Sequence, residues 1–147
     1  MERPSPERAP TKVPFQPAHP DQRASLTNPE HWSSYEDAVS ALDSERGDGI
    51  GFVLGDGIFG IDLDHCRDDN SPTAWAQTVL GRVPTYAEVS PSGTGAHLIG
   101  KTDQPVTSIR VKGIELYGHD RYFTITGHRL HEKPVANCTE AVVQLGA

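Results

Sequence analysis

The stretch from Gly49 to Asp64, GIGFVLGDGIFGIDLD, constrains the fold more than any other part of the chain. Two apolar runs, residues 49–54 and 58–64, flank a short Gly-Asp-Gly segment. Glycine and aspartate between two such runs favour a tight connection between antiparallel strands. The sequence therefore predicts a β-hairpin here.

The second of these runs ends in two acidic residues. Alternate residues of a strand point to the same face, so we expect Asp62 and Asp64 to project together. Ile61 and Leu63 then face the other side. Two neighbouring carboxylates are costly to keep ionised without a cation, and Mg²⁺ or Mn²⁺ prefers such oxygen ligands. The alternative is a pair of solvated acids on an edge strand, but the apolar flanks favour a strand in the sheet interior.

Further short strands are predicted wherever apolar runs are separated by glycine, serine, proline or aspartate. They cover residues 86–89, 96–99, 113–117 and 122–126.

Helices are predicted in three places. The first follows Ser33, which has capping-box spacing to Glu36, and ends before Gly47 and Gly49. The apolar residues at its helical spacing predict one buried stripe: Trp32, Tyr35, Val39 and Leu42. The second helix begins after residues 70–72, carries Trp75 and Val79 on one face, and ends at Gly81. A last helical turn or two is expected over residues 139–145.

Proline sets the character of the N-terminus. Six of the first twenty residues are proline, which excludes a regular helix. We therefore expect a flexible proline-rich arm over residues 1–11. The length of the remainder fits a single domain, residues 12–147.

A glycine-bearing loop, SPSGTGAH, runs into the predicted strand that carries His97. Glycine lets backbone amides approach an anion closely, so Gly93 and Gly95 favour phosphate binding. The Ser92 hydroxyl and the His97 imidazole can both donate to phosphate oxygens. The alternative is an ordinary turn followed by a histidine satisfied within the sheet.

Two more charged residues lie in the last third of the chain. Glu115 shares a strand face with Tyr117 in GIELYG and could complete a carboxylate triad, or could simply lie on a polar face. Arg121 begins the next predicted strand and is a candidate phosphate clamp, with a surface ion pair as the alternative.

Charge restricts the partners that such a chain can bind. The formal net charge of -7 argues against a general nucleic-acid coat. Residues 1–100 carry 15 acids and 7 Lys or Arg, whereas residues 101–147 carry 5 acids and 6 Lys or Arg. A phosphate-bearing ligand would therefore be met mainly by the C-terminal part.

Cysteine and hydropathy patterns narrow the class of protein. Cys66 and Cys138 form no CxxC pair, so neither a disulfide framework nor a four-ligand zinc site is indicated. No apolar run approaches the ~20 residues that span a bilayer, and no signal peptide is recognisable. We therefore expect a cytoplasmic protein that does not associate with membranes.

Taken in order, the motifs resemble a known family. DLD after the GIGFVLG strand, then SPSGTGAH, then GIELYG followed by RYFTITGH, is similar to the bifunctional DNA primase-polymerase (prim-pol) domain of the archaeo-eukaryotic primase superfamily. Upstream, KVPF and ASLTNPEHWSSYEDA look like the lead-in segment of plasmid and phage members. The resemblance covers roughly residues 12–128, and the ordered set is far more specific than any one motif.

The resemblance implies a fold and an activity. The fold is α+β, with a small antiparallel sheet like that of an RNA-recognition module (RRM-like) and flanking helices. The activity is template-directed primer or DNA synthesis from NTPs or dNTPs on single-stranded DNA, in replication of a plasmid, virus or other mobile element. A separate helicase is a candidate partner.

The resemblance also implies roles for individual residues. By position, the family's metal-binding pair falls on Asp62 and Asp64, its third acidic residue on Glu115, and its nucleotide-contacting histidine on His97. Two ions, Mg²⁺ or Mn²⁺, are expected there, with Arg121 or Lys112 as additional counter-charges to the triphosphate.

Two other functions stay open from the sequence. One is a non-catalytic module that retains the fold and binds nucleotide or nucleic acid without transferring nucleotides. The other is a metal-dependent phosphoesterase that uses the same carboxylates with water as the nucleophile.

Overall fold

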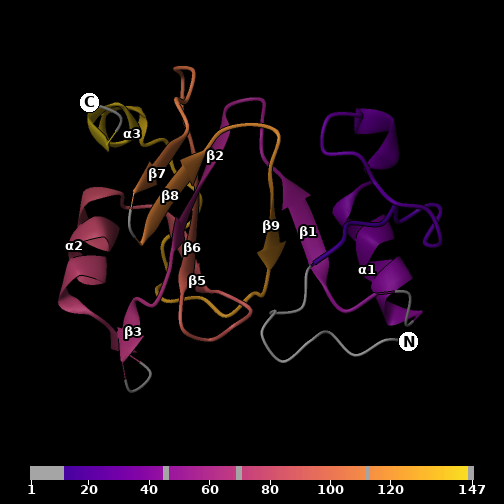
Figure 1. Cartoon of the computed structure of the whole chain (residues 1–147), viewed down its shortest axis with the longest axis horizontal. Helices are drawn as coiled ribbons and strands as arrows, with labels where there is room; N and C mark the ends of the chain where they lie inside the picture. The colour runs from indigo at the N-terminus through magenta and orange to yellow at the C-terminus, as the bar shows by residue number, and fades with distance from the viewer. Residues whose placement is uncertain (1–11, 45–46, 69–70, 112, 146–147) are drawn as a thin grey trace. The chain divides into compact units, whose positions relative to one another are not determined.

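The computed structural model describes residues 12–44, 47–68, 71–111 and 113–145 (Figure 1). The expected arm over residues 1–11 and the candidate counter-charge Lys112 lie outside the described residues. The chain divides into two compact units, Met1–Asp48 and Gly49–Ala147.

The first unit contains a short 3-10 helix, Pro29–His31 (η1), and the helix Tyr35–Asp43 (α1). The predicted helix is therefore present, but its cap is Ser34 rather than Ser33. The Ser34 hydroxyl accepts a hydrogen bond from the amide of Asp37 at 3.2 Å, and this satisfies one of the amide groups that a helix start leaves unpaired.

The predicted buried stripe on this helix is wrong. No residue of α1 is buried, and Tyr35 is 70% exposed. Trp32 lies before the helix, where its indole N–H donates to the carbonyl of Ser25 at 2.9 Å. A unit this small encloses too little volume to cover a full helix face.

The second unit is built from antiparallel strands. The five-stranded sheet has the order β5-β6-β2-β8-β7; its members are Tyr86–Val89 (β5), Ala96–Lys101 (β6), Ile58–Leu63 (β2), Ile114–Tyr117 (β8) and Ile109–Val111 (β7). Two smaller pairs are Ile50–Val53 (β1) with Tyr122–Ile125 (β9), here called the β1–β9 ribbon, and Arg67–Asp68 (β3) with Ser71–Pro72 (β4). The helices of this unit are Ala74–Arg82 (α2) and Thr139–Leu145 (α3). The expected α+β class with antiparallel strands is confirmed, and β3, β4 and β7 are strands that the sequence did not predict.

The hairpin predicted between residues 49–54 and 58–64 is wrong in its pairing. The tight turn exists, since Gly55 and Ile58 exchange backbone hydrogen bonds of 3.2 and 3.0 Å. However, β1 pairs with β9, whereas β2 lies between β6 and β8. A Cβ on Gly60 of β2 would lie 2.6 Å from the Phe123 ring and 2.9 Å from the Leu54 side chain. The ribbon therefore packs over the face of β2, through the space that this glycine leaves, instead of extending the sheet beside it.

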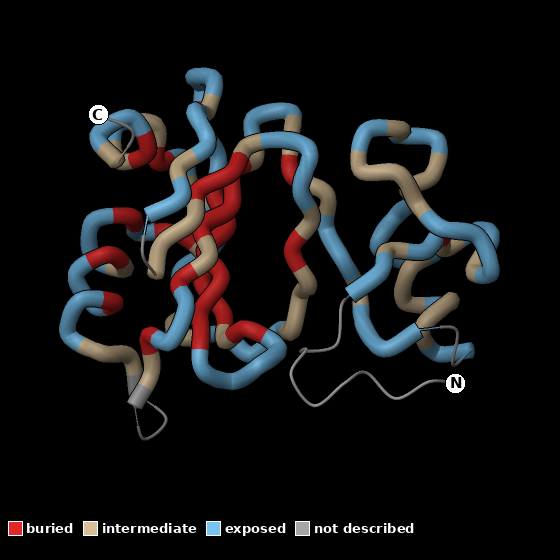
Figure 2. The backbone as a smooth tube through the Cα atoms, viewed as in Figure 1, coloured by how far each residue is buried: buried red, intermediate tan, exposed pale blue. Residues whose placement is uncertain are grey.

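Helices α2 and α3 cover one face of the five-stranded sheet, and the buried residues gather in its central strands (Figures 1 and 2). Ile61 and Leu63 are fully buried in this core, on the face away from Asp62, as predicted. On α2 the predicted apolar face is only half correct. Val79 is buried, but Trp75 is 39% exposed and rests against the turn at Gly113.

Both cysteines are free thiols in this core. Cys66 and Cys138 are buried, and burial raises the pKa of each thiol. A raised pKa keeps a thiol protonated and unreactive. Within the part of the chain that the structure describes, no helix combines the length and the apolar character that crossing a membrane requires.

Candidate functional site

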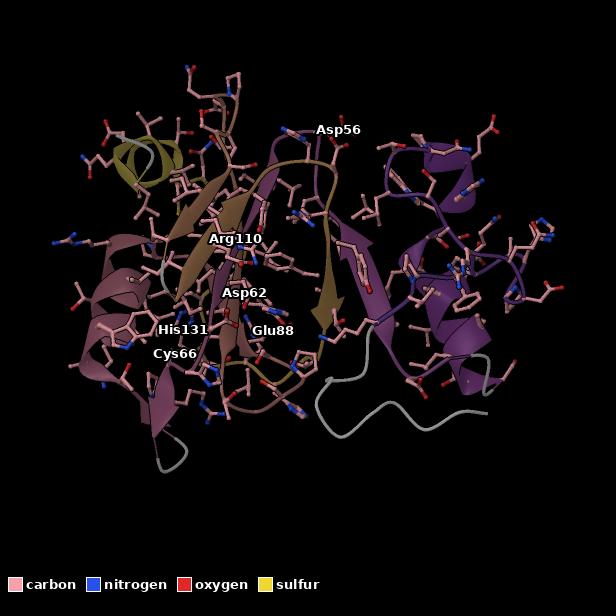
Figure 3. All side chains as sticks on the ribbon, in the orientation of Figure 1. Asp56, Asp62, Cys66, Glu88, Arg110 and His131 are labelled. Atoms are coloured by element: carbon pink, nitrogen blue, oxygen red, sulfur yellow. The ribbon has the colours of Figure 1, made fainter. Side chains whose placement is uncertain are left out.

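Five polar side chains form one row across the five-stranded sheet, one from each strand. Glu88 on β5 is opposite His97 on β6, His97 is opposite Asp62 on β2, Asp62 is opposite Glu115 on β8, and Glu115 is opposite Arg110 on β7. Directly opposed residues of antiparallel strands share a face. This polar row therefore lies on the face away from α2 and α3, where Figure 3 labels three of its members, Asp62, Glu88 and Arg110.

His97 is held on three sides. Its Nε2 atom lies 3.6 Å from Oδ1 of Asp62, and its Nδ1 atom lies 3.1 Å from the carbonyl oxygen of Thr124 on β9. The ring packs against that of Phe123, with the centroids 4.7 Å apart. Because a carbonyl oxygen can only accept, Nδ1 must carry a hydrogen. The other ring nitrogen, Nε2, faces Asp62.

Glu88 is the most deeply buried acid in the polar row, with no exposed surface. Its Oε1 atom accepts from the Tyr86 hydroxyl at 2.6 Å and from the Gly127 amide at 3.4 Å. Its Oε2 atom accepts from the amide and the hydroxyl of Thr126 at 2.5 and 2.9 Å. Burial of the Tyr86 hydroxyl, its hydrogen bond to Glu88 and the negative charge of Glu88 together raise the pKa of Tyr86 to about 12.

The structure brings together two of the three acids predicted to bind metal. Asp62 and Glu115 lie opposite each other on adjacent strands, with side chains 27% and 22% exposed. Asp64 follows β2, is exposed, and is tied by its amide to the carbonyl of Gly113 at 2.9 Å. The described residues contain no group of three His, Cys, Asp or Glu side chains arranged to hold a metal ion. Glu115 is instead paired with Arg110, whose Nε lies 3.0 Å from Oε1.

The donors nevertheless suit a hard cation in their chemistry. The oxygens of Asp62 and Glu115 are the ligand type that Mg²⁺ and Mn²⁺ prefer, and both carboxylates are partly open to solvent. Arg110, which is 79% exposed, supplies the positive charge beside Glu115. A metal held by all three acids stays a prediction.

The predicted phosphate loop connects β5 to β6 beside this row. Hydrogen bonds link the hydroxyls of Ser90, Ser92 and Thr94 in sequence, at 3.1 and 3.0 Å. Gly93 has a φ of 82°, which favours glycine. A Cβ on Gly95 would lie 2.6 Å from the carbonyl oxygen of Leu63. Both glycines are thus required by the path of the loop, which lies close against the strand end that carries the acids.

Arg121 lies beside Tyr117 of β8. Its guanidinium carbon is 4.7 Å from the centre of the Tyr117 ring. Tyr117 shares its strand and face with Glu115, and burial followed by the charge and hydrogen bond of Glu115 raises the pKa of Tyr117. Arg121, the predicted phosphate-binding residue, is therefore separated from Glu115 by the Tyr117 side chain.

Three functional candidates were missed by sequence reasoning: Glu88, Arg110 and Arg67. Arg67 donates from Nη1 to the carbonyl of Gly93 at 3.0 Å and so places a positive charge beside the loop. A signal for Glu88 was available, because a loop that closes with Val89 opposite Ala96 necessarily puts Glu88 opposite His97. Arg110 and Arg67 lie on short strands with no clear alternation in the sequence.

Comparison with known proteins adds a relative. No protein-family model matches the chain. A protein described as DNA Primase-polymerase, from Nitratiruptor phage NrS-1, is 36% identical over 128 residues. The match covers 80% of this chain and 18% of the phage protein. The chain thus corresponds to less than a fifth of the length of this phage protein.

Proposed function

We propose that this chain carries the nucleotidyltransferase site of a DNA primase-polymerase that serves the replication of a mobile element. It would add nucleotides from NTPs or dNTPs to a 3′ end on a single-stranded DNA template. The observation that carries the proposal is the polar row, because Asp62, His97 and Glu115 are distant in sequence yet lie side by side on one sheet face. The similarity to a phage protein of that name supports it.

The acids have a clear task in such a reaction. Asp62, Asp64 and Glu115 would hold one or two Mg²⁺ or Mn²⁺ ions, which supply a charge that activates the attacking hydroxyl and stabilises the leaving pyrophosphate. Two carboxylates in opposing positions repel each other, so the site favours a cation. Glu115 would have to release Arg110 to take part, because the guanidinium lies against its carboxylate.

Cationic and hydroxyl donors flank the acids on both sides. Towards β5 are the hydroxyls of Ser92 and Thr94 together with Arg67, which contacts the same loop. On the other side are Arg110 of β7 and Arg121, which contacts Tyr117 of β8. A triphosphate beside Asp62 would meet donors at both ends, and the Arg110 guanidinium released from Glu115 could pair with a phosphate oxygen.

His97 would donate from Nε2 to a phosphate oxygen of the incoming nucleotide as an imidazolium, because Nδ1 already holds the hydrogen that faces Thr124. The hydrogen bond to Thr124 and the Phe123 ring hold the imidazole in one orientation, which reduces the freedom lost when substrate binds. Electrostatic stabilisation by such fixed donors is a main source of rate enhancement in phosphoryl transfer.

One observation favours a second candidate, a non-catalytic nucleotide-binding module. Glu115 is paired with Arg110, and the described part of the chain shows no three-ligand metal group. If that arrangement persists with nucleotide present, the chain would bind a triphosphate through its loop and its arginines without transferring it.

The test is primer synthesis and extension on single-stranded DNA with Mn²⁺ and NTPs or dNTPs. The natural protein should extend the primer, and Asp64→Ala and His97→Ala should each lose most of the activity. Equal behaviour of all three proteins would show that the site is assigned wrongly. Nucleotide binding without extension by the natural protein would favour the second candidate, and release of nucleotides from labelled DNA without added dNTP would indicate a phosphoesterase.

A further inference from the structure

The proposed reaction gives Glu88 no direct task, yet its environment is highly specific. A carboxylate removed from water is costly unless hydrogen bonds replace its hydration. Glu88 has no exposed surface and accepts four hydrogen bonds, from Tyr86, Thr126 and Gly127. The question is what this buried carboxylate holds in place.

Three of the four donors belong to residues 126–127, directly after β9. They are the amide and hydroxyl of Thr126 and the amide of Gly127. The Thr126 hydroxyl also lies 2.6 Å from the carbonyl oxygen of Val89, the neighbour of Glu88. The Glu88 side chain thus fastens the end of β9 to β5, beside two backbone hydrogen bonds that join β5 to the residues further on, from Val89 to His128 at 2.8 Å and from Leu130 to Ala87 at 2.9 Å.

The same strand carries the groups that orient His97. The Thr124 carbonyl contacts Nδ1 of the imidazole at 3.1 Å, and the Phe123 ring packs on it. Thr124 is two residues from Thr126, so a shift at the fastened end displaces the carbonyl as well. Glu88 and His97 are also opposed in register on β5 and β6, which places both ends of this connection on one sheet face.

We propose that Glu88 is a positioning residue for His97: it fixes the end of β9 on β5, and β9 in turn holds the imidazole with Nε2 towards Asp62. The catalytic consequence rests on the proposed nucleotidyltransferase function. The chain of contacts from Glu88 through Thr126 and Thr124 to His97 does not depend on it.

Glu88→Gln is the decisive variant. Glutamine has nearly the same size but keeps only one acceptor oxygen, and its amide nitrogen only donates, so either the Thr126 amide or the Gly127 amide loses its acceptor. Thr126→Val, which removes the hydroxyl and leaves the amide, should act in the same direction with a smaller effect, and it serves if Glu88→Gln fails to fold.

Thr85→Val is the matched control. Thr85 is also fully buried and precedes β5, and its hydroxyl donates to the Ile99 carbonyl and accepts from the Ala136 amide, both at 2.8 Å. The control loses buried hydrogen bonds of the same kind, but none of them reaches β9 or His97.

The readout is the imidazole ¹⁵N spectrum of His97, assigned with His97→Asn, together with KM and kcat for the nucleotide and direct Mn²⁺ binding. In the natural protein Nδ1 should carry the hydrogen. Glu88→Gln should move the His97 signals towards those of a mobile, tautomer-exchanging imidazole and raise KM about tenfold. Its Mn²⁺ affinity should not change, and Thr85→Val should keep the natural His97 spectrum and KM.

A folded Glu88→Gln protein with the natural His97 spectrum would overturn the inference. So would a Thr85→Val protein that shows the same His97 change, because loss of stability alone would then explain both. If the natural protein does not extend primers, the proposed function fails, but the imidazole spectra still decide whether Glu88 positions His97.

Discussion

Asp62 and Glu115 occupy directly opposed positions on adjacent strands of the five-stranded sheet. Like charges in such positions destabilise a sheet, and each acid has a nitrogen partner on its other side. Asp62 is next to Nε2 of His97, and Glu115 is next to Nε of Arg110. Within the polar row, Asp62 and Glu115 therefore lie between two basic groups. A change to any of these four side chains alters the charge that its neighbours experience.

Asp62→Asn tests whether this pair of acids binds metal. The change keeps the shape of the side chain but removes its charge, so Mn²⁺ affinity should fall on the order of tenfold or more. The unfolding free energy should change by less than about 1 kcal/mol, because lost repulsion from Glu115 and lost attraction to His97 offset each other. Mn²⁺ binding followed by EPR and urea unfolding measure the two effects.

Asp56→Asn is the control for that change. Asp56 is an exposed acid in the turn before β2, with a φ of 51° that asparagine also adopts readily. The control should bind Mn²⁺ like the natural protein. Unchanged Mn²⁺ affinity in Asp62→Asn would mean that Asp62 is not a ligand.

Gly60→Ala tests how the β1–β9 ribbon sits on the sheet. The added methyl group would meet the Phe123 ring at 2.6 Å, and Phe123 packs on His97. Displacing the ring should lower the unfolding free energy by about 1–3 kcal/mol and reduce activity through His97. Urea unfolding and primer extension measure the two consequences.

The same substitution at Gly81 is its counterpart. Gly81 lies within α2, and nothing is within 4 Å of its Cβ position. Alanine there should raise the unfolding free energy by about 0.5–1 kcal/mol, because alanine has the higher helix propensity. Equal effects of the two substitutions would contradict the packing of Phe123 on Gly60.

The sequence was sufficient to predict most strands and the faces of their residues. Alternation alone correctly placed Ile61 and Leu63 opposite Asp62, because the period of two is a local property of any strand. Pairing is not local. The turn at residues 55–57 implied that β1 and β2 pair. Instead β1 pairs with the distant β9, and this ribbon packs over Gly60 of β2, where no side chain blocks it.

The candidate site was only partly accessible from the sequence for the same reason. The motifs identified Asp62, His97 and Glu115, and the structure places these three side by side. Arg110 belongs to a three-residue edge strand whose importance comes entirely from its register with Glu115. Register across non-consecutive strands depends on the whole sheet, so a single sequence does not reveal it.

Tyr86→Phe tests the hydrogen bond to buried Glu88 through its pH dependence. Burial, followed by the hydrogen bond and charge of Glu88, raises the pKa of Tyr86 from 10.0 to about 12. The folded state thus favours the neutral phenol, whose stabilising contribution is fully present below pH 10 and is lost as the pH rises through about 12. The variant should be less stable by about 1.5–3 kcal/mol at neutral pH, and the difference should shrink in alkali.

Urea unfolding at a series of pH values measures this difference. Tyr122→Phe is the comparison, because burial is what raises the pKa of Tyr122 and its hydroxyl has no such carboxylate partner among the described hydrogen bonds. It should cost less at neutral pH. A gap between Tyr86→Phe and the natural protein that stays constant into alkali would contradict the assigned hydrogen bond.

Arg110→Ala tests whether the guanidinium competes with metal for Glu115. The Arg110 side chain is 79% exposed, so losing the ion pair should change the unfolding free energy by no more than about 1 kcal/mol. The freed carboxylate should bind Mn²⁺ more tightly, by a factor of up to about five, which is the change in affinity that about 1 kcal/mol produces. The nucleotide KM should rise, because a phosphate partner is lost.

Arg82→Ala, at the exposed end of α2, is the control and should change neither the Mn²⁺ affinity nor the nucleotide KM. If Mn²⁺ binds Arg110→Ala no better than the natural protein, Glu115 does not exchange its arginine for metal, and the non-catalytic candidate gains support.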